Sequence, residues 1–309
     1  MSIAMESMSI PAAGATLAAT VTRDAVAPAR GAALVIAGAG PRTRKDTSGL
    51  VDILVRTGLT TLAYDKRGTG ESTGDFESAG LWDLVEDNRA ALSYLAERVP
   101  SAQDRLVVLG ISQGAGMAVM VHAAHPVAGL VLVVPALFTD LGSPADRERS
   151  LELEYHGTRR ELGQDLSFEE FKRWREEAVE TIRTSKGDTV SLFGRTVAAK
   201  FLRESLAYDA AEDLGRVQCP VLVIGGAKDL MCPPPARVAL TRAMPGPLTY
   251  HVVPDMTHAL SRTDETPTVE GYADILQAQW NHGVIDDAVK SHIRGWVAQH
   301  FEVPRPPLS

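Results

Sequence analysis

The chain is predicted to fold as an α/β protein with a doubly wound, mostly parallel sheet. Short aliphatic segments that end in glycine or turn residues are typical of strands. Most are continuous apolar runs, as expected when both faces of a strand are covered. Segments of helical periodicity separate them along the chain. This alternation favours right-handed crossovers between parallel strands.

The individual elements follow from the same patterns. The residues on either side of the Ala12–Gly14 turn predict two more polar strands that form an antiparallel edge. The aliphatic segments predict six further strands, at about Ala33–Ala37, Thr60–Tyr64, Leu106–Gly110, Gly129–Val134, Val221–Gly225 and Thr249–Val253. The helical periodicity predicts helices over Asp46–Arg56, Leu81–Arg98, Gln113–Ala124 and Asp286–Phe301.

One region interrupts the alternation of strands and helices. From about Thr139 to Asp209 the sequence is charged and helical, and Ser167 with Glu170 forms a capping box at the start of one helix. The region is too long for a loop. We therefore predict a helical cap over residues 139–209, inserted into a core formed by residues 1–138 and 210–309.

Composition restricts the possible partners. The chain has 309 residues, 45% of them apolar, and a net charge of −8 without a basic stripe, which argues against a nucleic-acid partner. No apolar run is long enough to cross a bilayer and the N-terminus lacks the pattern of a secretory signal, so no membrane partner and a cytoplasmic location are expected. Cys219 and Cys232 form neither a disulfide framework nor a CxxC pair, and no metal is expected. The sequence carries no signal for the oligomeric state.

The strongest motif is a GxSxG sequence centred on Ser112. A predicted strand precedes it and a helix of small residues follows it. A nucleophile on such a sharp strand-to-helix turn needs small neighbours two residues away on each side, and Gly110 and Gly114 occupy those positions. The N-terminus of the following helix favours developing negative charge. Ser112 is therefore the predicted nucleophile.

A serine hydroxyl needs a base, usually a histidine that a carboxylate orients. Of the eight histidines, His258 alone lies in a polar loop that leaves a late strand at its C-terminal end, the edge where ligands bind in open α/β sheets. Asp229 follows another strand end, and the order Ser112, Asp229, His258 is that of the nucleophile-elbow fold. Asp255 is the alternative acid, although its place in the loop of His258 favours a turn.

Acyl transfer also requires two N–H donors for the developing oxyanion. One is expected from the backbone of Gln113, and the second from the loop after the strand Ala33–Ala37, with Ala39 favoured over Gly40. The segment YDKRGTGES, residues 64–72, follows the next strand. It lacks the GxxxxGK[ST] phosphate-binding pattern, and we interpret it as a tight loop that supports the oxyanion loop.

These motifs resemble those of the α/β-hydrolases along nearly the whole chain. GISQG, YDKRGTGES and the stretch from Gly38 to Arg42 are similar to the elbow, the DxRGxGxS loop and the oxyanion loop of esterase and acyl-hydrolase branches. The resemblance implies an eight-stranded, mostly parallel sheet flanked by helices, a lid between strands six and seven, and catalysis by Ser112, Asp229 and His258. Many members have His-Gly before the oxyanion residue, where this chain has Ala37-Gly38.

The expected activity is that of a cofactor-independent serine hydrolase acting on a carboxylic ester or thioester of a small molecule. The same residues would also serve amide or C–C bond hydrolysis, or acyl transfer and cyclisation, and a non-catalytic ligand-binding protein is a further alternative. Substrate specificity resides in the loops and the cap. Four aromatic residues of the predicted cap are candidates to line the pocket, or else pack within the cap: Tyr155, Phe168, Phe171 and Trp174.

Overall fold

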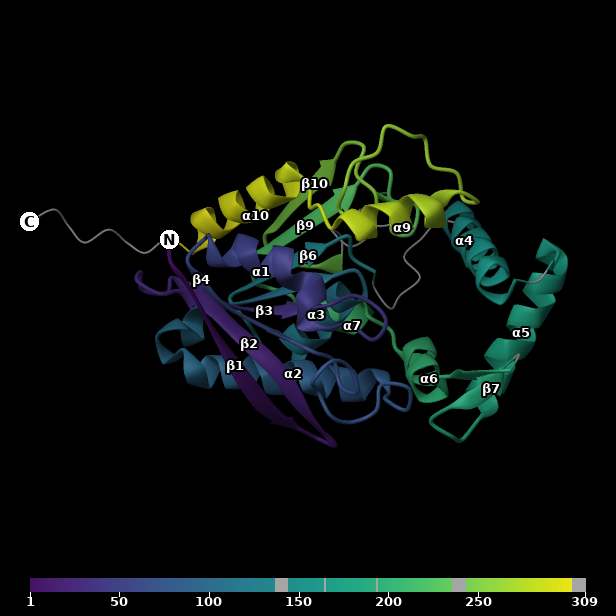
Figure 1. Ribbon diagram of the computed structural model, residues 1–309, viewed down its shortest axis with the longest axis horizontal. Coiled ribbons are helices and arrows are strands. Elements are labelled where there is room, and N and C mark those ends of the chain that lie inside the picture. Colours follow the sequence, from purple (N-terminus) through teal and green to yellow (C-terminus); the bar gives the residue numbers. More distant parts are fainter. Residues whose placement is uncertain (137–143, 164, 193, 235–242, 302–309) are drawn as a thin grey trace, which may run out of the picture.

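The fold is built on one eight-stranded sheet with the strand order β1-β2-β4-β3-β5-β6-β9-β10 (Figure 1). The structure is a computed structural model that describes residues 1–136, 144–163, 165–192, 194–234 and 243–301. β1 pairs with β2, and β2 with β4, in antiparallel register, while every later pair is parallel. The predicted fold class is thereby confirmed, including the antiparallel edge at the N-terminus.

The strands agree with the sequence prediction to within a few residues. β3, β4 and β9 are buried along their whole length, as the continuous apolar runs predicted. The eight strands of the sheet are β1 (Ile3–Ala12), β2 (Ala15–Asp24), β3 (Gly31–Ile36), β4 (Leu59–Tyr64), β5 (Leu106–Ile111), β6 (Gly129–Val133), β9 (Val221–Gly226) and β10 (Leu248–Val253).

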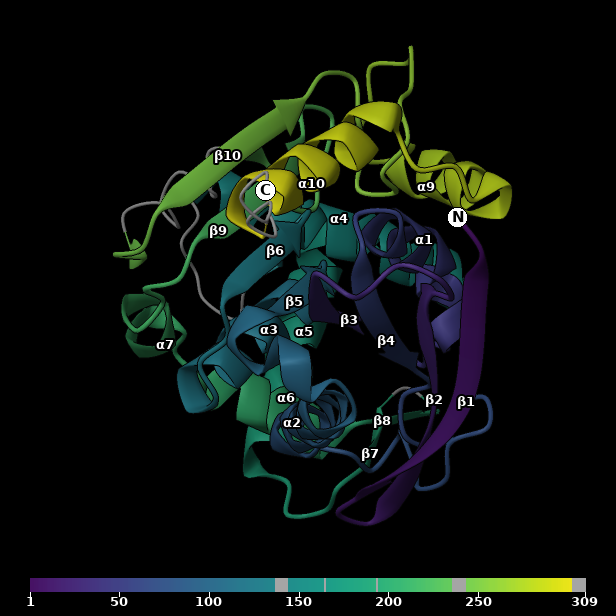
Figure 2. The ribbon, with the colours of Figure 1, turned by 90° about the vertical axis from the view of Figure 1, so that its left-hand side faces the viewer.

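Helices cover both faces of the sheet, so that its strands lie between two apolar layers (Figure 2). One layer is formed with α1 (Ser48–Val55) and α10 (Asp287–His300), and the other with α2 (Leu81–Arg98), α3 (Gln113–Ala124) and α7 (Ala211–Gly215). α3 is buried nearly all round, as its small apolar residues predicted. Among the helices of the described residues, none has the length and apolar content that a membrane crossing requires.

In the part of the chain that the structure describes, the segment between β6 and β9 contributes no strand to the main sheet. It contains α4 (Pro144–Leu162), α5 (Phe168–Thr184), a hairpin of β7 (Val190–Leu192) and β8 (Arg195–Val197), and α6 (Ala199–Ala207). Figure 1 shows these elements at one end of the molecule, with α4 beside α9 (Tyr272–His282). An ion pair between Arg160 of α4 and Asp274 of α9 joins the two helices. Ser167 accepts a hydrogen bond from the backbone N–H of Glu170, which confirms the capping box. The predicted boundary at residues 138 and 139 lies outside the described residues, and that this segment forms a cap stays a prediction.

Two glycines allow strand β5 and helix α3 to meet closely at the turn that carries Ser112. A Cβ atom on Gly110 would lie 2.2 Å from the carbonyl oxygen of Gly114, and one on Gly114 would lie 2.4 Å from that of Ile36. Both contacts are with backbone, which cannot rotate away as a side chain can. The spacing of small residues in the motif is therefore a packing requirement.

We expect the Gly110→Ala variant to unfold at lower denaturant concentration, with a loss of about 1–3 kcal/mol in the free energy of unfolding, because the added methyl group forces the strand and helix apart. Gly157→Ala is the matched control. Gly157 lies in α4 with no atom within 4 Å of an added Cβ, so alanine should raise stability slightly through helix propensity. Equal unfolding midpoints for the two variants would contradict the packing argument.

Candidate active site

Ser112 occupies a strained position between β5 and α3. Its backbone has φ 54° and ψ −122°, a region that residues other than glycine rarely adopt. The N–H of Ser112 donates to the carbonyl of Val133 on the neighbouring strand, and its own carbonyl accepts from Ala115 in the first turn of α3. These bonds hold the residue at the C-terminal edge of the sheet, with the N-terminus of α3 directly behind it.

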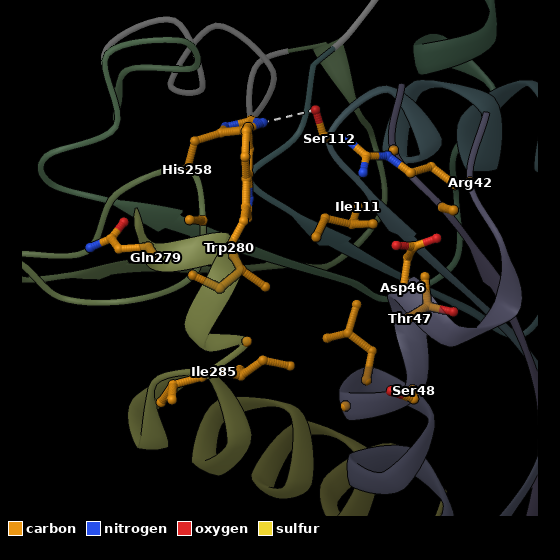
Figure 3. Close-up of a pocket in the computed structure, with 18 of the residues that line it drawn as sticks. Arg42, Asp46, Thr47, Ser48, Ile111, Ser112, His258, Gln279, Trp280 and Ile285 are labelled. Carbon is orange, nitrogen blue, oxygen red and sulfur yellow. Dashed lines mark hydrogen bonds between the residues drawn. The ribbon is translucent and has the colours of Figure 1, made fainter. Parts of the chain in front are cut away.

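Hydrogen bonds connect Ser112 to His258 and His258 to Asp229. The Oγ atom of Ser112 lies 2.9 Å from Nε2 of His258 (Figure 3). Nδ1 of His258 lies 2.9 Å from Oδ2 of Asp229. Asp229 follows β9 and His258 follows β10, so adjacent parallel strands deliver the two side chains to the same edge. The sequence-predicted order Ser, Asp, His is thus brought together in space.

Backbone N–H groups hold the carboxylate of Asp229 in place. Its Oδ1 atom accepts hydrogen bonds from the backbone N–H groups of Met231 at 3.0 Å and Cys232 at 2.9 Å, and the side chain is 1% exposed. Burial lowers the pKa of the neighbouring His258 imidazole, but the charge and hydrogen bond of Asp229, with a smaller contribution from Cys232, outweigh burial and raise that pKa above its ordinary value. The pair therefore stabilises a positive charge on the imidazole.

Asp255, the alternative acid, lies apart from this arrangement. Its carboxylate pairs with the ammonium of Lys228 at 2.9 Å and is half exposed, and its backbone φ of 57° marks a turn. The structure thus groups Asp229, and not Asp255, with His258.

The loop that follows β3 packs against Ser112. A Cβ on Gly38 would lie 3.4 Å from the Cβ of Ser112, which is ordinary van der Waals contact, so the loop passes close to the nucleophile. Ala39 follows and lines the same pocket as Ser112, and Gln113 begins α3. Of the two residues predicted to donate N–H groups to an oxyanion, Gln113 thus follows Ser112 directly in the chain, and Ala39 lines the same cavity as Ser112.

A cavity of about 450 Å³ opens beside Ser112 and His258. Figure 3 shows it between the start of α1 and the end of α9. Its charged lining residues other than His258 are Arg42, Lys45 and Asp46. The apolar part of its lining includes Leu50, Ile111, Met231, Leu260, Trp280 and Ile285. The cavity thus offers an apolar wall with a few polar groups near the serine, which is typical of a small-molecule site.

The four aromatic residues predicted to line the pocket lie elsewhere. Within the described residues, none of them is part of the lining of the cavity beside Ser112. They pack on one another between α4 and α5, with ring centroids 5.2 to 6.4 Å apart, and one of them is fully buried. Helical spacing reveals an apolar face but not what that face packs on, and here the partner is the other helix. The residues concerned are Tyr155, Phe168, Phe171 and Trp174.

Tyr272 is a site residue that the sequence analysis did not assign. Its hydroxyl accepts a hydrogen bond from the backbone N–H of His258 at 3.0 Å and lies 3.5 Å from Oδ1 of Asp229. Tyr272 begins α9, and Trp280 at the other end of that helix lines the cavity. The only signal in the sequence was a tyrosine and a tryptophan in a segment after His258. Such a signal does not show which way the two side chains point.

Among the described residues, one group of side chains has the spacing of a metal site: Asp229, Cys232 and His258. Both ring nitrogens of His258 are already engaged, with Asp229 and with Ser112. A metal ion on these ligands would replace the bond to one of them. We therefore assign no metal role to this group.

The comparisons with known proteins agree with the geometry. The chain belongs to the serine aminopeptidase S33 family of α/β hydrolases, whose model matches residues 27–265. It matches no curated protein at a significant level.

Three solved structures illustrate the similarity of fold. Est1E from Butyrivibrio proteoclasticus, with ferulic acid bound, is 21% identical, with 88% of this chain and 99% of that chain covered and a TM-score of 0.59. The Pyrococcus furiosus esterase Pf2001 is 14% identical, with 97% and 92% covered and a TM-score of 0.60. The α/β hydrolase GrgF from Penicillium sp. sh18 is 18% identical, with 97% and 99% covered and a TM-score of 0.59.

Proposed function

We propose that this hydrolase cleaves a carboxylic ester or thioester of a small molecule through an acyl-enzyme on Ser112. The observation that carries the proposal is the unbroken series of hydrogen bonds from Ser112 through His258 to Asp229, at the edge of a cavity large enough for a small acyl group. Two of the similar solved structures are described as esterases or hold ferulic acid, which supports the same class of substrate.

In the proposed reaction His258 removes the proton of the Ser112 hydroxyl as its oxygen attacks the substrate carbonyl. Asp229 holds the imidazole in the tautomer whose Nε2 accepts this proton, and its charge stabilises the imidazolium that forms. The backbone N–H groups of Gln113 and Ala39 donate to the oxyanion. His258 then returns the proton to the leaving alcohol or thiol, and water, activated by the same imidazole, releases the acid. No cofactor takes part in these steps.

The charges at the cavity favour an ester or thioester over the free amino terminus that an aminopeptidase recognises. Two cationic residues, Arg42 and Lys45, line the cavity, whereas within the described residues Asp46 supplies the one carboxylate of the lining. An Oδ atom of Asp46 already accepts hydrogen bonds from the N–H and hydroxyl of Thr43. A substrate ammonium group would therefore meet repulsion from two cations and a carboxylate that is partly used.

A matched series of substrates tests this proposal. We expect p-nitrophenyl esters and acyl thioesters of short chains to be hydrolysed, and the aminoacyl p-nitroanilides of similar size to be cleaved at least tenfold more slowly, about 1.4 kcal/mol in activation free energy. A fluorophosphonate probe should label the protein. Faster cleavage of the anilides would favour a peptidase instead, and ligand binding without turnover or labelling would favour a non-catalytic protein. The proposal also includes a small-molecule substrate and a cytoplasmic location.

A further inference from the structure

Lys66 is a buried cation that the proposed mechanism does not use. It lies in the YDKRGTGES segment directly after β4 and is 4% exposed. It forms no ion pair with any carboxylate of the residues that the structure describes. The neighbouring Asp65 instead binds the backbone N–H groups of Arg44 and Glu71 and the guanidinium of Arg44. A buried lysine without a counter-ion is unfavourable for stability, so its position calls for another explanation.

Residue 66 holds the oxyanion loop at both ends. The ammonium of Lys66 donates to the carbonyl oxygen of Gly38 at 2.5 Å, and its backbone N–H donates to the carbonyl of Arg42 at 3.0 Å. The side chain also passes near the ring of Phe76, with Nζ 5.8 Å from the ring centroid. The five residues from Gly38 to Arg42 are thus fixed to the loop that follows the adjacent strand.

The geometry of the peptide unit carries this contact to the nucleophile. The Gly38–Ala39 peptide is trans, so the N–H of Ala39 points opposite to the carbonyl of Gly38. Drawing that carbonyl toward the ammonium of Lys66 therefore directs the N–H of Ala39 away from Lys66. Gly38 itself packs against Ser112, since a Cβ there would contact the Cβ of the serine.

We propose that Lys66 is a positioning residue that holds the Gly38–Ala39 peptide in the orientation needed to bind the oxyanion and strengthens that N–H donor through its positive charge. The ammonium polarises the peptide whose carbonyl it binds, and a more polarised peptide has a more acidic N–H. When negative charge forms on the substrate oxygen, this buried charge is already in place, with little water to screen it. The inference rests on the proposed serine hydrolase activity.

The pKa of Lys66 sets the pH range over which the side chain carries its charge. Burial, together with the charge of Arg42, lowers the pKa of Lys66 from 10.5 to about 7. Because the folded pKa lies below the unfolded one, the protonated lysine destabilises the fold fully below about pH 7. This penalty decreases as the pH rises toward 10.5 and is absent above it. A charged lysine kept only for stability would instead stabilise the fold when protonated.

The Lys66→Met variant separates positioning from structure. Methionine replaces the aliphatic part of the side chain and removes the charge and the donor. We expect kcat/KM for a p-nitrophenyl ester to fall about 10- to 100-fold, less than the loss of a donor that contacts the oxyanion directly. KM should change by less than about threefold, while the inhibition constant of a trifluoromethyl ketone, which forms an oxyanion on the serine, should rise in parallel with the loss in kcat/KM. At pH 6 the Tm should be equal to or higher than that of the wild type.

Lys290→Met is the matched control. Lys290 lies on α10 and pairs with Asp287, and its replacement should leave kcat/KM and the inhibition constant unchanged. The role of Lys66 is overturned if Lys66→Met keeps the kinetic constants of the wild type, or if its loss of activity is explained by a lower Tm. In both cases the hydrolase activity stands. A wild-type protein that reacts with neither ester nor fluorophosphonate overturns the proposed function, and with it the role of Lys66.

Discussion

Replacing Ser112 by alanine should reduce kcat for a p-nitrophenyl ester by about 10⁴-fold or more and abolish labelling by a fluorophosphonate. The Oγ atom of Ser112 lies 2.9 Å from Nε2 of His258, the atom that would take its proton. Without it the imidazole has no hydroxyl to activate, although the cavity and the oxyanion donors are retained. Alanine adopts the same backbone as readily as serine does, so the variant should fold.

Three measurements make this result specific to Ser112. The Tm of the Ser112→Ala variant should be close to that of the wild type. Ser101→Ala, at an exposed serine that is not part of the cavity lining, should keep full activity and labelling. Peptide mapping of the labelled wild type should find the phosphonate on Ser112. Undiminished labelling of Ser112→Ala would show that another residue is the nucleophile and would remove the basis of the proposed function.

The sheet could be predicted because its signals are local. Strands buried on both faces require continuous apolar runs, and β3, β4 and β9 carry them in their own residues. The two strands of the β7–β8 hairpin are only three residues long and lie outside the sheet, so their sequence has no comparable pattern. They were absent from the prediction for that reason.

The residues of the predicted triad could be named from the sequence, whereas the walls of the cavity could not. Ser112, Asp229 and His258 each follow a strand, and the parallel topology brings the ends of parallel strands to one edge. Trp280 and Ile285 reach the same cavity from the end of α9 and the residues after it, a placement set by tertiary packing. Periodicity assigns a side chain to a helix face but does not identify what that face meets.

Asp229→Asn should have an effect comparable to that of Ser112→Ala, with kcat reduced by about 10⁴-fold. The backbone N–H groups of Met231 and Cys232 both point at Oδ1 of Asp229. In the variant these two donors require an oxygen at that position, so the amide nitrogen must face Nδ1 of His258. An amide N–H donates to Nδ1 and places the ring proton on Nε2. The imidazole would then donate to Ser112 where the reaction needs it to accept.

The pH profile provides a second, independent signature of the same substitution. The base must be neutral, so kcat/KM rises with pH through the pKa of His258, which Asp229 raises above 6.5 in the wild type. Asp229→Asn removes the charge and the hydrogen bond that raise this pKa most, while burial still lowers it and the smaller contribution of Cys232 remains. The rising limb should therefore move to lower pH even though the plateau falls. A loss of activity without this shift would indicate a disturbed fold.

Asp255→Asn distinguishes the two candidate acids. Asp255 is paired with Lys228 and half exposed, and removing its charge breaks only a surface ion pair, which contributes about 0–1 kcal/mol. Its kcat and its pH profile should match those of the wild type. If Asp255→Asn instead showed the low plateau, and Asp229→Asn retained the full rate with an unshifted limb, the carboxylate that orients His258 would be Asp255. The hydrogen bond of 2.9 Å between Asp229 and His258 would then have no catalytic role.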